Sequence, residues 1–314
     1  MARRDPLAAR CSALEALAKA TTVPDVAEVR RGLTDRASLV VAAAARVVTA
    51  HRLEDLATDV AAALDRHYQA DDPQCRAKHA CLSTLIALRE ATAEQACRAA
   101  AHRQPEPVWG GTQDSAGPLR ILGLEALAAE GRAEVFSLLA DLLGDDLAEV
   151  RSAAAKVAGD LGGERAALLL RLRLRLGDDD EPANIGDYAA GLLAISGDDA
   201  VPLVRDLLEQ ADRTTAGPLA LALGASRLPT ALPVLLSVLD RLAAPLADED
   251  LVTAIALHRS ERAAACLLDL LEDPHRARLA AAELRLYRDR ENVMADARRR
   301  VGGRMDLLAR LDPP

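Results

Sequence analysis

The sequence of 314 residues contains few aromatic residues, which make up only 2% of the chain as one Phe, one Trp and three Tyr. Hydrophobic residues nevertheless account for 50% of the chain. Its core must therefore be built mainly from Ala, Leu and Val. A composition dominated by Ala and Leu favours closely packed helices.

The sequence also lacks paired cysteines and long apolar segments. Its five cysteines are an odd number and form no Cys-x-x-Cys motif, so we expect free thiols in a reducing compartment. Near the start, Asp5, Glu15 and Lys19 interrupt the apolar run that a signal peptide would need. No apolar run approaches the roughly 20 residues that span a bilayer. These features predict a cytoplasmic protein that does not bind a membrane.

An excess of basic charge and the common catalytic motifs are missing as well. The formal net charge is −9 at pH 7, whereas dedicated nucleic-acid binders usually carry a basic excess. The sequence contains no GxSxG, GxxxxGK(S/T) or HExxH motif. We therefore expect no enzyme activity, no catalytic residue, no bound metal and no cofactor.

What the sequence does contain is an internal repeat. The tripeptide Gly-Asp-Asp occurs at 144–146, 177–179 and 197–199, so its first two copies are 33 residues apart. Glycine readily adopts the left-handed conformation that ends a helix, and aspartate caps the start of the next one. Self-similarity at this period is the signature of a helical solenoid.

Aspartates locate the expected helix pairs. The first helix of each pair should follow one of Asp35, Asp72, Asp114, Asp146, Asp180, Asp212, Asp248 and Asp273, with one more pair before Asp35.

Leu and Arg alternate from Leu170 to Leu176, which is typical of a strand. We predict a helix there, because Leu and Arg favour helices and Leu168, Leu172 and Leu176 have i, i+4 spacing. No hairpin turn with flanking strands is evident, so we expect essentially no sheet.

Three segments resemble HEAT repeats, especially the short bacterial kind similar to phycobilisome-lyase HEAT-like repeats. These segments are DDPQCRAKHACLSTLIAL, DDLAEVRSAAAKVAGDLG and EDPHRARLAAAELRL. The resemblance implies an all-α fold, a right-handed α-α superhelix of about eight to nine helix pairs. It also implies one solenoid over residues 1–314, with residues 274–314 as a C-terminal capping unit.

In HEAT repeats an aspartate and an arginine form a ladder between neighbouring repeats. The resemblance carries this structural role only to residues that match both positions. Those residues are Asp72 with Arg76, Asp114 with Arg120, and Asp146 with Arg151.

The superfamily includes a few enzymes, whose features are largely missing here. Deoxyhypusine hydroxylase has His-Glu dipeptides that bind iron, but none of the six His in this sequence is followed by Glu. HEAT-like alkylpurine DNA glycosylases need aromatic residues on a basic concave surface, and a single Trp provides too few.

Cys75, His79 and Cys81 are spaced so that their side chains could bind one metal ion. Because they do not form a recognised ligand set, we predict that they are core residues. A lyase-type enzyme stays open as an alternative, because of the repeat type.

Five arginines are candidate partner-binding residues, because the second helices of HEAT pairs are expected to line the concave surface. They are Arg98, Arg103, Arg171, Arg175 and Arg205. An arginine-bearing groove suits carboxylate or phosphate ligands. This favours another protein with an acidic surface or segment as the partner and leaves nucleic acid as the alternative. Pairing with neighbouring carboxylates such as Asp206 would instead make these arginines a solvated face.

The single tryptophan lies in a Pro- and Gly-rich insertion loop over residues 103–117. Insertions in solenoids are often used in binding, and Trp is a favoured interface anchor. Trp109, Gly110 and Gly111 are therefore candidate partner-binding residues. Alternatively, Trp109 packs over an exposed junction between repeats, because an isolated indole buries its apolar surface wherever it can. The sequence thus leads to the hypothesis of a non-catalytic protein-interaction scaffold.

Overall fold

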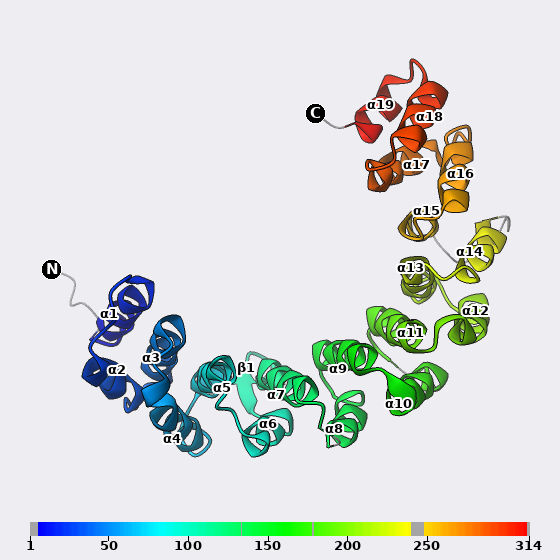
Figure 1. Ribbon diagram of the computed structural model, residues 1–314. Coiled ribbons are helices and arrows are strands. Elements are labelled where there is room, and N and C mark those ends of the chain that lie inside the picture. Colours follow the sequence, from blue (N-terminus) through cyan, green and yellow to red (C-terminus); the bar gives the residue numbers. More distant parts are fainter. Residues whose placement is uncertain (1–5, 133, 178, 240–247, 313–314) are drawn as a thin grey trace. The chain divides into compact units, whose positions relative to one another are not determined.

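The computed structural model describes residues 6–132, 134–177, 179–239 and 248–312. Helices packed in pairs make up most of this part of the chain, and their packing is consistent with an α solenoid (Figure 1). The chain divides into two compact units, Met1–Ala154 and Ala155–Pro314, so the boundary falls inside helix α9, Ala148–Leu161. No helix among the described residues is long and apolar enough to cross a membrane.

The first unit consists of helix pairs and one β-hairpin. Its helices are α1 (Pro6–Lys19), α2 (Val26–Leu33), α3 (Ser38–His51), η1 (Glu54–Leu56), α4 (Ala57–His67), η2 (Pro73–Cys75), α5 (Arg76–Leu88), α6 (Ala93–Ala100), α7 (Gly117–Ala129), α8 (Val135–Leu142) and the first half of α9. The hairpin, β1 (Pro105–Val108) and β2 (Gly111–Asp114), lies between α6 and α7.

The second unit contains the rest of α9 and the helices that follow it. They are α10 (Gly163–Leu176), α11 (Pro182–Ser196), η3 (Gly197–Ala200), α12 (Val201–Gln210), α13 (Ala216–Ser226), α14 (Ala231–Leu239), α15 (Asp248–Leu257), α16 (Glu261–Leu270), α17 (Ala277–Glu283), η4 (Leu284–Tyr287), α18 (Glu291–Val301) and α19 (Met305–Leu311). Residues 274–312 of the expected capping unit form α17, η4, α18 and α19.

Within each unit, the first helices of consecutive pairs pack closely against one another. Helix α3 packs on α1 and α5, and helix α13 packs on α11 and α15. Glycine permits this approach, because a Cβ on Gly224 of α13 would lie 2.0 Å from the carbonyl oxygen of Ala254 on α15. Second helices such as α2 and α4 contact each other at few positions. The first helices accordingly form the inner row of each unit and the second helices the outer row (Figure 1).

The aspartates mark the helix starts as predicted, because each first helix begins at or shortly after its aspartate. Two capping residues differ from the prediction by one position. Asp145 rather than Asp146 accepts a hydrogen bond from Leu147 N, and Asp179 rather than Asp180 accepts one from Glu181 N. In both cases the cap needs a carboxylate two residues before its N–H donor. Asp178, between Gly177 and Asp179, lies outside the described residues.

Leu168 to Leu176 is helical as predicted and forms the second half of α10. The leucine row whose spacing supported the helix prediction is not the row that faces the core. Leu170 and Leu174 are buried, whereas Leu168, Leu172 and Leu176 are 58%, 55% and 54% exposed. The sequence offered two leucine rows with the same i, i+4 spacing, and only the packing of α10 against α11 distinguishes them.

The expectation of essentially no sheet is wrong at the insertion, which forms a β-hairpin instead of an irregular loop. Strands β1 and β2 are antiparallel, with Pro105 opposite Asp114 and Val108 opposite Gly111. The turn depends on Gly110, whose φ of +91° is accessible to glycine without steric cost. Pro105 and Pro107 obscured the strand in the sequence, because proline lacks the N–H that a ladder needs. Because Pro105 and Pro107 are two residues apart, the N–H groups that they lack would both point to the same edge of β1.

Candidate functional site

The tip of the β-hairpin presents the only tryptophan of the chain to solvent. The Trp109 side chain is 101% exposed and the neighbouring Val108 is 46% exposed. No heavy atom lies within 4 Å of a Cβ placed on Gly110 or Gly111, so open space surrounds the tip. The alternative in which Trp109 packs over a junction between repeats is therefore wrong. A large apolar side chain is held in water, where it gains nothing from folding.

Hydrogen bonds around Glu106 hold the base of the hairpin against the start of α5. Glu106 Oε1 accepts from Gln104 Nε2 at 2.6 Å, from Gln74 N at 2.6 Å and from Ser115 Oγ at 2.8 Å. The hydrogen bonds from Gln104, Gln74 and Ser115 lower the pKa of Glu106. Gln104 Nε2 also donates to the backbone oxygen of Asp72 at 2.7 Å. The hairpin is thus a fixed arm rather than a loose loop.

A buried ion-pair network follows the hairpin. The Arg120 side chain is fully buried, and its guanidinium donates to Asp114 at 2.6 Å and to Asp145 at 2.9 Å. Arg103 Nη1 lies 2.6 Å from the second oxygen of Asp145. Arg120 therefore links the aspartates that begin two consecutive repeats. This is the ladder that the HEAT resemblance implies for Asp114 and Arg120, with Asp145 in place of Asp146.

The corresponding position in the preceding repeat is lysine. Asp72 is buried and accepts hydrogen bonds from Ala77 N and Lys78 N, and Lys78 Nζ lies 3.4 Å from its carboxylate. Arg76, the residue expected to pair with Asp72, is exposed and donates to Gln74 Oε1 at 2.8 Å. The basic residue lies six positions after the aspartate, as Arg120 does after Asp114, and this spacing was the available signal.

Three of the five candidate arginines already pair with carboxylates of the chain. Arg98 lies 3.0 Å from Asp65, Arg103 pairs with Asp145, and Arg205 pairs with Asp206 at 2.8 Å. Arg98 also stacks on the ring of Tyr68, with 3.7 Å between its guanidinium carbon and the ring centroid. Arg98 and Arg103 belong to the first unit and the others to the second.

The helices that carry these arginines do not line the inner row. Arg98 is on α6, Arg171 and Arg175 are on α10, and Arg205 is on α12. These second helices form the outer row of their respective units (Figure 1). Within each unit these arginines therefore lie on the helices opposite the closely packed first helices, and a concave arginine groove stays a prediction.

Helix α10 combines the remaining two arginines with an apolar stripe. Arg171 and Arg175 are exposed and make no hydrogen bond or ion pair with any residue that the structure describes. Leu168, Leu172 and Leu176 follow one another on the adjacent helix face and are each more than half exposed. We call these five residues the α10 face. It offers apolar area and two guanidinium groups, side by side, that no described residue neutralises.

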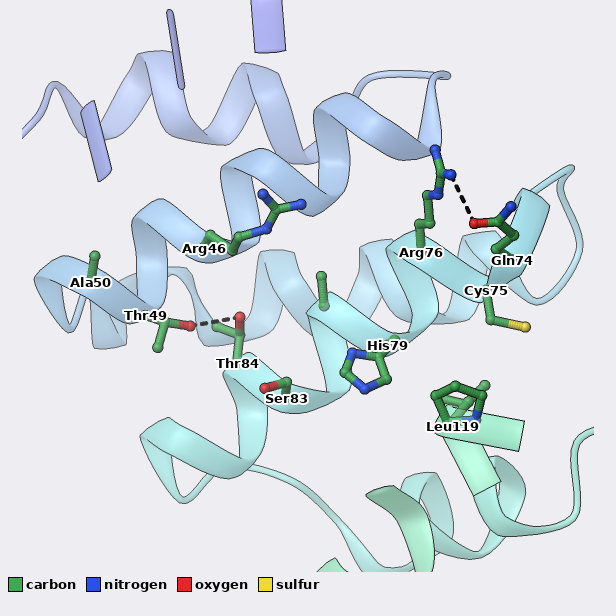
Figure 2. Close-up of a pocket in the computed structure, with 12 residues that line it drawn as sticks. Arg46, Thr49, Ala50, Gln74, Cys75, Arg76, His79, Ser83, Thr84 and Leu119 are labelled. Carbon is green, nitrogen blue, oxygen red and sulfur yellow. Dashed lines mark hydrogen bonds between the residues drawn. The ribbon is translucent and has the colours of Figure 1, made fainter. Parts of the chain in front are cut away.

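A pocket of about 600 Å³ lies between α3 and α5 and is closed at one end by the start of α7 (Figure 2). Arg46 comes from α3, whereas Arg76, His79 and Ser83 come from α5. Burial lowers the pKa of His79 below its usual value of 6.5, so this imidazole is neutral at pH 7. The pocket residues include no carboxylate. Sequence reasoning gave no indication of this pocket, because its walls come from separate repeats.

The cysteines around this pocket behave as buried apolar side chains. Burial raises the pKa of Cys75 to about 11 and that of Cys81 to about 12, so both thiols are protonated at neutral pH. No group of three or more His, Cys, Asp or Glu side chains in the described part of the chain could hold a metal ion.

Comparison of the sequence with models of known protein families gives no match, and comparison with curated proteins gives none either.

Proposed function

We propose that this chain is a non-catalytic protein-interaction scaffold of the HEAT-repeat kind that engages a partner protein through Trp109. The observation that carries the proposal is the fully exposed indole at the tip of the β-hairpin. Trp is the residue most enriched among interface hot spots, because it contributes a large rigid apolar surface and one hydrogen-bond donor. A partner with an apolar pocket would bury it.

The anchored base of the hairpin supports this role. Glu106 receives three hydrogen bonds from three different residues, and they fix the arm before any partner arrives. Binding through a preorganised arm loses less conformational entropy than binding through a flexible loop. The hairpin therefore suits an anchor better than the irregular insertion expected from the sequence.

The α10 face supports a second contact with a partner that carries acidic residues. Leu168, Leu172 and Leu176 offer an apolar row, and Arg171 and Arg175 flank it with charges that the described part of the chain leaves unneutralised. An amphipathic partner helix with carboxylates beside its apolar face would match both features. We therefore propose the arginine-bearing outer face, rather than a concave groove, as a site for an acidic protein segment.

The proposal includes the finer architecture implied by the resemblance. We infer a right-handed superhelix of about eight to nine helix pairs that runs through residues 1–314 and ends in a cap over residues 274–314. The regular aspartate caps and the glycine-mediated packing of first helices within each unit support this inference. The free cysteines support a cytoplasmic location.

The test is affinity capture from the native host with immobilised wild-type protein and the Trp109→Ala variant, before and after nuclease treatment. We expect the wild-type chain to capture a partner protein. Nuclease treatment should not release this protein, and the Trp109→Ala variant should fail to capture it. Met305→Ala is the matched control, because Met305 is another exposed apolar residue at 74% exposure. Capture that disappears with nuclease and with Arg171→Gln/Arg175→Gln, but not with Trp109→Ala, would instead establish nucleic-acid binding.

A further inference from the structure

We propose that the pocket between α3 and α5 binds a small organic anion, whose phosphate or carboxylate head contacts Arg46 and Arg76 and whose apolar body fills the rest. This site is separate from the hairpin tip and from the α10 face. It therefore adds a small-molecule ligand to a protein-binding scaffold.

The charge of the pocket is the first argument. Arg46 makes no hydrogen bond or ion pair with the described residues, and Arg76 donates only to the neutral side chain of Gln74. No carboxylate of the described part of the chain lines the pocket, although the chain as a whole carries a net charge of −9. Many arginines elsewhere, such as Arg30 with Asp59, pair with acidic residues, although Arg171 and Arg175 do not pair with any described residue. Two guanidinium groups in one pocket that the described residues leave without a counter-ion match the oxygens of an anionic ligand.

Two neutral polar groups extend the site along α5. His79 is held neutral by burial, so its ring offers one donor and one acceptor at pH 7. The Ser83 hydroxyl is one helical turn further on and makes no hydrogen bond with the described residues. Figure 2 shows both side chains on the pocket side of α5. These groups provide hydrogen bonds to a head group without adding negative charge.

The remaining wall is apolar and suits the body of an organic molecule. Ala50, Ala80, Pro118 and Leu119 line it, and Leu119 is fully buried. A volume of about 600 Å³ is within the usual range of small-molecule sites, roughly 300–1,000 Å³. An inorganic ion alone would leave most of this space empty.

The pocket is also preorganised. Thr49 of α3 and Thr84 of α5 are joined by a hydrogen bond of 2.8 Å, which fixes the two walls (Figure 2). Gln74 has a φ of 60°, a left-handed conformation that costs energy for a residue other than glycine. Its backbone N–H is bound by Glu106 and its side chain orients Arg76. Strain of this kind at a pocket edge is typical of binding sites.

The experiment is calorimetric titration of the full chain with phenyl phosphate, benzoate and neutral benzyl alcohol. We expect an oxyanion probe to bind at least tenfold more tightly than benzyl alcohol, with the tighter of the two identifying a phosphate or a carboxylate head. Arg46→Gln and Arg76→Gln should each weaken that binding about tenfold, since each removes a charge-assisted contact. Arg262→Gln, at an exposed arginine of α16, is the matched control.

A second variant keeps the charges of the pocket and fills its volume with a larger side chain. Ser83→Phe should abolish probe binding while circular dichroism and the melting temperature stay unchanged. The inference is overturned if neither oxyanion binds at millimolar concentration, if benzyl alcohol binds equally well, or if Arg262→Gln has the same effect as Arg46→Gln. Trp109→Ala should leave probe binding intact, so this test fails or succeeds independently of the protein-binding proposal.

Discussion

Arg120 shows how a single residue stabilises the junction between two repeats. Its buried guanidinium bridges Asp114 and Asp145 and also donates to the backbone oxygen of His102. With few aromatic residues available, such polar bridges add specific contacts to a core of Ala, Leu and Val. A buried charge that loses its partner is costly, since water cannot replace that partner.

Arg120→Met should lower the free energy of unfolding by about 3–5 kcal/mol, because it removes the buried charge that pairs with the buried Asp145 and the half-buried Asp114. Urea denaturation measures this change, with Arg262→Met as the control for an exposed arginine. A loss below about 1 kcal/mol would show that Arg103 alone compensates both aspartates.

His67 should make stability depend on pH. It is 1% exposed, and neither ring nitrogen has a hydrogen-bond partner among the described residues. Burial lowers the pKa of His67 below its usual value of 6.5. The unfolded chain therefore binds this proton more readily, and stability falls as the pH drops from 6.5 through the folded-state value.

His67→Leu should be neutral or stabilising at pH 7, because it removes unpaired polar atoms from the core. The stability difference from wild type should grow in favour of the variant between pH 7 and pH 5, as measured by urea denaturation at each pH. A pH profile that the substitution leaves unchanged would exclude His67 as its source.

Among the elements, the β-hairpin depends on Glu106 for its attachment. Glu106→Ala should increase amide hydrogen exchange in β1 and β2 at least tenfold, because it removes three hydrogen bonds to one carboxylate. Gln113→Ala, on the opposite strand and exposed, is the control. Equal exchange in both variants would mean that strand pairing alone holds the arm.

Helix α10 permits a comparison of two leucines two positions apart. Leu170 is buried, so Leu170→Ala should lower the free energy of unfolding by about 2–5 kcal/mol. Leu172 is 55% exposed, so Leu172→Ala should change it by no more than about 0.5 kcal/mol. Thermal and urea denaturation distinguish the two, and equal losses would contradict the assignment of the α10 face.

The sequence was sufficient to predict helices and their starts, because an aspartate cap and a glycine stop act within a few residues. It was not sufficient for the hairpin, whose prolines and Trp-Gly turn lack the usual strand and turn signals. It also could not show which leucine row of α10 faces α11, or that Lys78 takes the place expected for Arg76. Those outcomes depend on packing between repeats, as does the pocket lined by Arg46 and His79.

At the scale of the whole chain, contacts are mainly between neighbouring helix pairs. Surfaces on different pairs can therefore be altered separately, and their effects on binding should add. The hairpin tip lies between α6 and α7, the proposed anion pocket lies mainly between α3 and α5, and the α10 face lies in the second unit. The proposed function and the proposed anion site would therefore place several separate binding surfaces on one repetitive core.

The decisive measurement is the affinity of a purified captured partner for wild type and for Trp109→Ala. We predict binding about thirtyfold weaker for the variant, or about 2 kcal/mol, because a hot-spot indole is removed. Its melting temperature should equal that of wild type, since Trp109 is fully exposed and contributes no packing. An unchanged affinity together with a lower melting temperature would contradict the account and make Trp109 a structural residue.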